Sequence, residues 1–202
     1  MRLYAIILTL IAALTAHAAD DPMRLRADRA YDWDDYAGAA AMYEVLISRT
    51  PDNPDLYTRA IVSQQMLADS AATIDLMQRA MAHGFKLSDM LATVRQADFA
   101  KGRAELYATY LVDLRDAMPW MTRALDNQLL QYYDFRNDGP MIEQYARRML
   151  APLPDSVEYL TLLARGLLLQ GKIDQAAAVW QQILTLDPTD PGARNHLEAL
   201  GR

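Results

Sequence analysis

Hydrophobic residues between Gly171 and Pro188 recur every three or four positions, as they do on one face of an α-helix. Ile173, Ala176 and Trp180 mark this apolar face, and polar residues fill most of the positions between them. The glycine favours a turn before the helix, and the proline stops the helix because it cannot continue the hydrogen-bonding ladder. The segment therefore predicts a turn, an amphipathic helix and a stop.

The same combination of turn and stop recurs upstream, and the stop position follows the turn position seventeen residues later each time. The turn positions 34, 68, 102, 137 and 171 are separated by 34 or 35 residues. Four of the nine prolines stand at the stop positions. The pairs are Asp34 with Pro51, Gly102 with Pro119, Asn137 with Pro154 and Gly171 with Pro188, while the copy at Ala68 and Phe85 lacks both residue types.

A repeat of this length, with a central turn and a proline near its end, resembles the tetratricopeptide repeat (TPR), a helix-turn-helix unit. The matching small and bulky residues are Leu163, Ala164, Ile173, Ala176 and Trp180 in the last unit, and Ala27, Tyr36, Ala39 and Tyr43 in the first. Small residues let helices approach closely, and bulky ones fill the space toward the next unit. The resemblance implies an all-α, right-handed α-solenoid of about five TPR-like units plus a C-terminal capping helix.

The predicted solenoid occupies residues 19–202. Its units are 20–53, 54–87, 88–122, 123–156 and 157–190, followed by the capping helix 191–202, for which Asp190 is the expected N-cap and Pro191 the first residue. The middle units match less well, and Arg95 and Tyr107 stand where small residues are usual. Whether residues 81–122 form a regular repeat is therefore left open, with Phe85 expected to pack in place of the missing proline.

The first eighteen residues are predicted to be a signal peptide. Arg2 is followed by an apolar run from Leu3 to Leu14, and Ala16-His17-Ala18 matches a signal peptidase site. The chain has no Cys, so neither a disulfide nor a lipid-modified thiol is available. Without residues 1–18 it carries 19 basic and 26 acidic residues, a balance that disfavours nucleic acid and anionic lipid surfaces. A periplasmic or secreted location is expected, with no stable membrane insertion after cleavage.

The sequence shows no recognisable motif for catalysis, for a cofactor or for a metal. His83 and His196 each lack a second ligand at helical spacing, so both are interpreted as surface histidines. The acidic run from Asp32 to Tyr36 lacks the spacing of a calcium loop, and Asp34 is expected to cap a helix. No phosphate loop, nucleophile elbow or zinc helix occurs. The sequence thus predicts a protein that is not an enzyme, with no cofactor and no metal.

The resemblance implies a concave groove lined by the first helix of each unit. The predicted partner-binding residues are Arg24, Asp28, Tyr31, Gln65, Gln96, Phe99, Gln131, Phe135 and Arg165, with Thr58, Val62, Asn127 and Thr161 at equivalent positions. None of the three lysines lies on these positions, so a clamp for a terminal carboxylate is not expected. In the helical run 131–135 not every side chain can point inward, so at least one of Tyr132, Tyr133 and Phe135 should be exposed or lie in the groove.

Two functions fit this pattern. The first is a non-enzymatic scaffold or adaptor of the cell envelope that binds a peptide or helix of a protein partner in its groove. The second is a self-associating structural module of a homo-oligomer or an envelope assembly. A monodisperse monomer would favour the first, and a concentration-dependent dimer the second.

Overall fold

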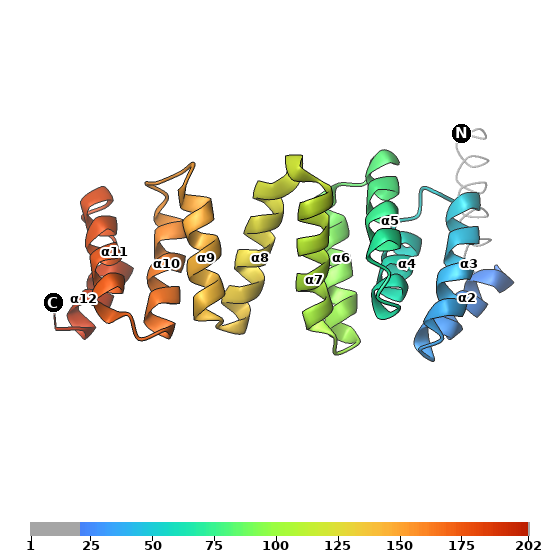
Figure 1. Cartoon of the computed structure of the whole chain (residues 1–202), viewed down its shortest axis with the longest axis horizontal. Coiled ribbons are helices and arrows are strands. Elements are labelled where there is room, and N and C mark those ends of the chain that lie inside the picture. Colours follow the sequence, from blue (N-terminus) through green and yellow to red (C-terminus); the bar gives the residue numbers. More distant parts are fainter. Residues whose placement is uncertain (1–20, 202) are drawn as a thin grey trace, which may run out of the picture. The chain divides into compact units, whose positions relative to one another are not determined.

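The computed structural model describes residues 21–201, and the predicted signal peptide lies outside them. These residues contain α-helices, one short 3₁₀ helix and no strand, so the all-α fold is confirmed (Figure 1). They divide into two compact units, 21–113 and 114–201, and the division falls within one helix, α7.

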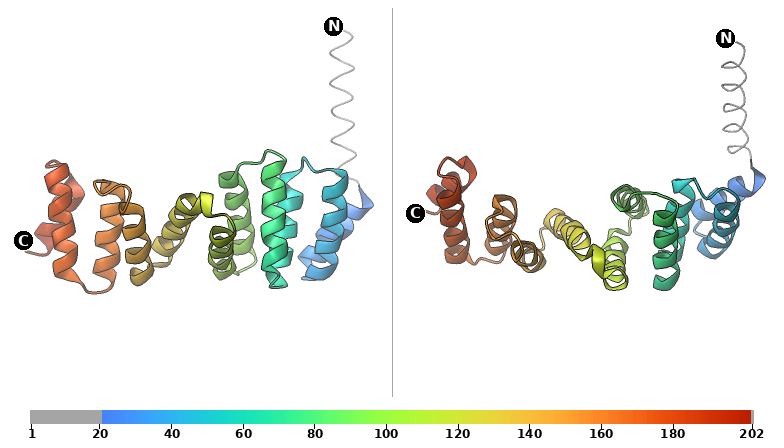
Figure 2. Two further views of the ribbon diagram at one scale, coloured as in Figure 1. Left: turned by 45° about the horizontal axis from the view of Figure 1, so that its top comes forward. Right: turned by 90° about the horizontal axis from the view of Figure 1, so that it is seen from above.

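The N-terminal unit holds α2 (Pro22–Asp32), α3 (Tyr36–Arg49), α4 (Pro54–Met66), α5 (Ser70–Ala82), α6 (Leu87–Ala100) and most of α7 (Ala104–Ala117). The C-terminal unit holds the end of α7, the 3₁₀ helix η1 (Pro119–Met121), α8 (Thr122–Arg136), α9 (Gly139–Leu150), α10 (Val157–Leu169), α11 (Ile173–Leu186) and α12 (Pro191–Ala199). Within each unit, helices that follow one another in sequence pack together as antiparallel neighbours (Figure 2).

All five predicted turn positions adopt the left-handed conformation. The φ angles are 62° at Asp34, 58° at Ala68, 68° at Gly102, 55° at Asn137 and 71° at Gly171. At every one, the next residue donates its backbone N–H to the carbonyl five positions earlier, at 2.8 to 3.0 Å. This is the closing bond of a Schellman motif, and it satisfies a carbonyl that the end of a helix leaves unpaired.

An aspartate follows three of these turns and begins the second helix. The Asp35, Asp69 and Asp138 carboxylates accept the backbone N–H three residues later, at 3.0 to 3.2 Å. One residue therefore closes the first helix with its backbone and caps the second with its side chain. The prediction that Asp34 is the cap was wrong, because the left-handed turn residue directs its side chain elsewhere and the cap falls on the following position.

Helix ends also fall at the predicted stop prolines, and a helix begins after Asp190. Helices end before each of the four stop prolines, and Asp190 caps α12 by accepting the N–H of Ala193 at 2.7 Å. Phe85 packs edge-on against Tyr57 with ring centroids 5.8 Å apart, at the stop position that lacks proline. Residues 81–122, left open by the sequence, form a helix pair of ordinary length, α6 and α7.

The core of each unit is built from the small and bulky residues of the repeat. Ala27, Ala39 and Tyr43 are fully buried in the N-terminal unit, as are Ala164 and Ala176 in the C-terminal unit. Helices α9 and α10 approach closely, and a Cβ on Gly166 would lie 2.9 Å from the backbone nitrogen of Glu143. Glycine at this position lets the two helices touch backbone to backbone.

Candidate functional site

In the N-terminal unit, Arg24 and Asp28 are part of a charged network between α2 and α4. Arg24 Nε donates to both carboxylate oxygens of Asp28 at 2.8 Å, and its Nη2 donates to Asp55. Arg59 lies 3.4 Å from Asp28 and 3.5 Å from Asp55, so two cations alternate with two anions. The Tyr43 hydroxyl donates to Asp28 at 2.7 Å, and burial, together with this bond, raises the pKa of Tyr43. The charged side chains of this network are therefore paired with one another within the unit.

Tyr31, the third predicted contact of this unit, lies between two cations. Lys101 at the end of α6 donates to the backbone oxygen of Tyr31 at 2.8 Å and to Asp34 Oδ1 at 3.0 Å. Its ammonium is 4.5 Å from the Tyr31 ring centroid and 5.5 Å from that of Tyr36, and the Arg59 guanidinium is 5.2 Å from Tyr31. Only 7% of Tyr31 is exposed, and burial raises its pKa to about 12.

The remaining predicted residues of the N-terminal unit are dispersed. Gln96 is exposed on α6, and Phe99, the second-last residue of that helix, is partly buried. Gln65 is 8% exposed and lines a cavity beside α7. Thr58, at an equivalent position, is buried and shares a hydrogen bond of 2.9 Å with Thr93. The structure therefore does not gather these side chains into one exposed patch.

In the C-terminal unit, the predicted residues of α8 face solvent. Gln131 and Phe135 are one helical turn apart and both are exposed, Phe135 by 68%. Tyr132, which lies between them in the sequence, is only 8% exposed. The exposure of Phe135 confirms the prediction that at least one aromatic side chain of this run faces outward. One turn before Gln131, Asn127 Oδ1 accepts a hydrogen bond of 3.4 Å from the Tyr159 hydroxyl of α10.

Arg165 of α10 lies against the same end of α8. Its guanidinium donates to Asp134 and to Asn137 Oδ1, the latter at 2.6 Å, while its side chain stays 43% exposed. This places a partly exposed cation beside the turn that carries Phe135. Gln131, Phe135 and Arg165 thus form a mixed surface with an amide, an aromatic ring and a guanidinium, which is called the α8 face below.

The two histidines have structural contacts. The His196 ring stacks on Trp180 with centroids 4.4 Å apart, and His83 Nδ1 lies 3.8 Å from Asp52. Among residues 21–201, no three metal-ligating side chains converge, and none of the helices described there has the length and apolarity needed to cross a membrane.

Lys101 is the contact that sequence reasoning missed. It is 70 residues from Tyr31, and no helical periodicity connects the two positions. The position of Lys101 directly before Gly102 could have indicated this contact. A long side chain beside one turn can reach the equivalent turn of another repeat. The cavity beside Gln65 was also missed.

The helix pairs, their left-handed turns and their spacing of 34 or 35 residues define the chain as a tandem array of tetratricopeptide-like units. No protein-family model and no curated protein sequence matches it.

Solved structures similar to the chain are TPR proteins. A thermophilic TPR protein from Thermus thermophilus is 21% identical, and the match covers 90% of this chain and 98% of that one with a TM-score of 0.46. YrrB, a TPR protein with an unusual peptide-binding site, is 12% identical over 95% and 97%, with a TM-score of 0.47. The C-terminal part of a TPR repeat-containing protein from Cytophaga hutchinsonii is 17% identical over 82% of this chain, with a TM-score of 0.44. This chain spans 65% of that last structure, just under two thirds of its length.

Proposed function

We propose that this protein is a non-enzymatic interaction adaptor of the cell envelope, and that its α8 face binds a peptide or a helix of a partner protein. The observation that carries the proposal is the exposure of Phe135 and Gln131 on adjacent turns of one rigid helix. Large aromatic side chains are favoured anchors of protein interfaces, because one ring buries much apolar area with little loss of conformational freedom.

The neighbours of Phe135 supply polar contacts suited to a polypeptide. The Gln131 amide can donate to a backbone carbonyl and accept from a backbone N–H at the same time. Arg165 is held in place by Asp134 and Asn137, so its exposed part is oriented before a partner arrives. A fixed donor loses little freedom on binding, which favours affinity.

The envelope location in this proposal rests on the leader-like residues 1–18. They combine a basic start, an apolar run and a small-residue cleavage pattern. Measuring the N-terminus of the protein recovered from the periplasm tests it, and Ala19 as the first residue is the expected result. An unprocessed chain recovered from the cytoplasm would contradict the location without bearing on the α8 face.

The binding surface can be tested by affinity capture from envelope extract. Gln131→Ala/Phe135→Ala removes the amide and the ring, and we expect it to lose a partner that the parent protein retains. The matched control is Gln182→Ala/Leu186→Ala on α11, an exposed amide and an exposed apolar residue at the same spacing, with Leu186 at 41% exposure. Retention by both variants would place binding elsewhere.

Self-association is the second candidate, favoured by Trp33 and Trp120, which are 78% and 70% exposed. Exposed tryptophans of this kind are typical of surfaces that a protein covers on assembly. Sedimentation over a hundredfold concentration range distinguishes the two functions. A monomer throughout supports the adaptor, and a concentration-dependent oligomer lost in Trp33→Ser or Trp120→Ser supports the assembly module.

A further inference from the structure

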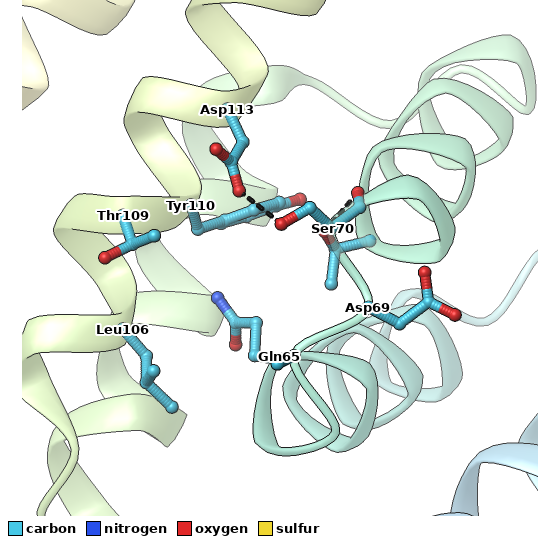
Figure 3. Close-up of a pocket in the computed structure, with 9 residues that line it drawn as sticks. Gln65, Asp69, Ser70, Leu106, Thr109, Tyr110 and Asp113 are labelled. Atoms are coloured by element: carbon cyan, nitrogen blue, oxygen red, sulfur yellow. Dashed lines mark hydrogen bonds between the residues drawn. The ribbon is translucent and has the colours of Figure 1, made fainter.

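A cavity of about 120 Å³ lies in the N-terminal unit, among the end of α4, the start of α5 and one face of α7. Figure 3 shows the side chains of Gln65, Leu106, Thr109 and Tyr110 around it, with Ser70 and Asp113 bonded to each other at one side. The cavity is separate from the α8 face, which belongs to the other compact unit.

Two buried polar side chains that line this cavity have no hydrogen-bond partner within the described part of the chain. They are the amide of Gln65, on a residue 8% exposed, and the hydroxyl of Tyr110, on a residue 2% exposed. A buried polar group left without a partner costs about 1 to 3 kcal/mol. Two such groups on facing helices and on one cavity indicate that something else supplies the missing hydrogen bonds.

The charge around the cavity favours a cation. Asp69 and Asp113 line it, and no basic side chain is among its lining residues. The Asp69 carboxylate is engaged as the cap of α5, whereas Asp113 accepts one hydrogen bond within residues 21–201, 2.6 Å from Ser70 Oγ, and a carboxylate can accept several. Behind Gln65, the side chain of Asp98 is fully buried, and because burial favours its neutral form it adds little to this charge. The Gln65 amide lies near Asp98 and offsets part of the rise that burial causes in the pKa of Asp98. The two side chains do not, however, meet hydrogen-bonding geometry.

The volume restricts the ligand to a small group. Pockets for drug-sized molecules and cofactors measure about 300 to 1,000 Å³, whereas a water molecule occupies about 30 Å³ of liquid. A cavity of about 120 Å³ therefore holds the end of one side chain or a comparably small cation. The acceptors available to it are Gln65 Oε1, Tyr110 Oη and the Asp113 carboxylate.

We propose that this cavity binds a guanidinium group, carried either by an arginine side chain of a partner or by a small free molecule. A guanidinium is planar and has five N–H donors and no acceptor, so it can donate to all three acceptors at once, whereas Gln65 Nε2 is not satisfied by it. Its charge offsets that of Asp113, which a neutral amide or water would not do. The proposal does not depend on the α8 face.

Ethylguanidinium and ethylurea provide the first test, because the two molecules have nearly the same shape and only the first is charged. We expect ethylguanidinium to shift the NMR signals of the Gln65 side-chain amide saturably and to bind about ten times more tightly than ethylurea, as expected for about 1.4 kcal/mol. Equal affinities would show that the cavity does not select a charged group, and the absence of a saturable shift would show that it does not admit a guanidinium; either result would overturn the proposal.

Variants localise the effect. Asp113→Asn keeps an acceptor for Ser70 while removing the charge, and Tyr110→Phe keeps the ring while removing the hydroxyl; each should weaken ethylguanidinium binding about tenfold. The matched control is Asp89→Asn on α6, because Asp89 is exposed and also accepts from a serine, Ser88 Oγ, at 3.1 Å. An equal loss in the control would overturn the assignment.

The source of the guanidinium is then decided by comparing free arginine with acetyl-Ala-Arg-Ala-amide. Tighter binding of the tripeptide supports a partner's arginine side chain, and tighter binding of free arginine supports a small molecule. Failure of both, with ethylguanidinium bound, would overturn the proposal that the natural ligand is an arginine-like group.

Discussion

The first helices of the two compact units present different surfaces to solvent. In the N-terminal unit, Arg24 and Asp28 are paired with charges of the next repeat, and Tyr31 is covered by Lys101. In the C-terminal unit, Gln131 and Phe135 are exposed. Equivalent positions of a repeat therefore differ in availability, and the residues that the neighbouring repeats supply decide which position can meet a partner.

The two units also treat buried carboxylates differently, and pH gives the largest expected effect. Burial raises the pKa of Asp98 to about 7 from 3.8. In the C-terminal unit, Asp126 faces Arg115 at 3.5 Å and Arg148 at 3.6 Å. Between the ordinary pKa of Asp98, 3.8, and its raised pKa in the folded protein, about 7, the folded protein holds a proton on Asp98 that the unfolded chain has released. Stability therefore falls as pH rises from about 4 to about 7.

The size of this pH effect follows from the shift in the pKa of Asp98. A change of one pKa unit corresponds to about 1.4 kcal/mol, so the free energy of unfolding should fall by about 4 kcal/mol across this range because of Asp98. Urea titrations of the parent protein and of Asp98→Asn between pH 4 and pH 8 measure it as the change in their difference. The exposed Asp89→Asn provides the control, and a difference independent of pH would contradict the prediction.

Close helix packing gives the next effect, in the C-terminal unit. Gly166→Ala would place a methyl group 2.9 Å from the backbone nitrogen of Glu143 and 2.9 Å from Ile142 Cγ2. Because α9 and α10 must then separate, we expect a loss of about 3 kcal/mol in the free energy of unfolding by urea. Gly192→Ala, whose Cβ meets only a carboxylate oxygen at 3.3 Å, should change it by less than about 1 kcal/mol.

Removing one anion tests the contrast between the two surfaces directly. Asp28→Ala leaves Arg24, Arg59 and the Tyr43 hydroxyl without their shared partner, and we expect a loss of about 2 kcal/mol. Gln131→Ala on the exposed surface should cost less than about 0.5 kcal/mol. Similar losses for both, measured by urea denaturation, would show that the two faces contribute alike to stability.

The turns give the smallest effect, with one variant in each unit. Ala68 has a φ of 58°, a left-handed conformation in which a Cβ atom is strained. Ala68→Gly removes the Cβ and should therefore raise the free energy of unfolding by about 1 kcal/mol. Asn137→Gly should instead lower it by about 0.5 kcal/mol, because asparagine already tolerates this conformation and its Oδ1 accepts a hydrogen bond from Arg165 that glycine cannot replace. Thermal unfolding measures both, and a destabilised Ala68→Gly would contradict the expected strain.

The sequence predicts the architecture well because local signals specify it. Proline stops, turn spacing and helical periodicity locate the helix pairs, and they succeed even at Ala68, where the preferred residue is absent. The surface is less predictable. Periodicity assigns Gln65 to a helix face, but only 8% of Gln65 is exposed, and the residues of α7 that line a cavity with it cannot be inferred from α4 itself.

The five left-handed turns also make the chain divisible. Asp34 and Ala68 have the same backbone conformation, and each is followed by an aspartate that caps the next helix. Deleting residues 35–68 would join Asp34 directly to Asp69 and leave that corner intact. Gene segments that end at these two turns can therefore be joined or removed in frame. The array can then gain or lose a whole repeat while keeping the same turn and the same helix cap between its helices.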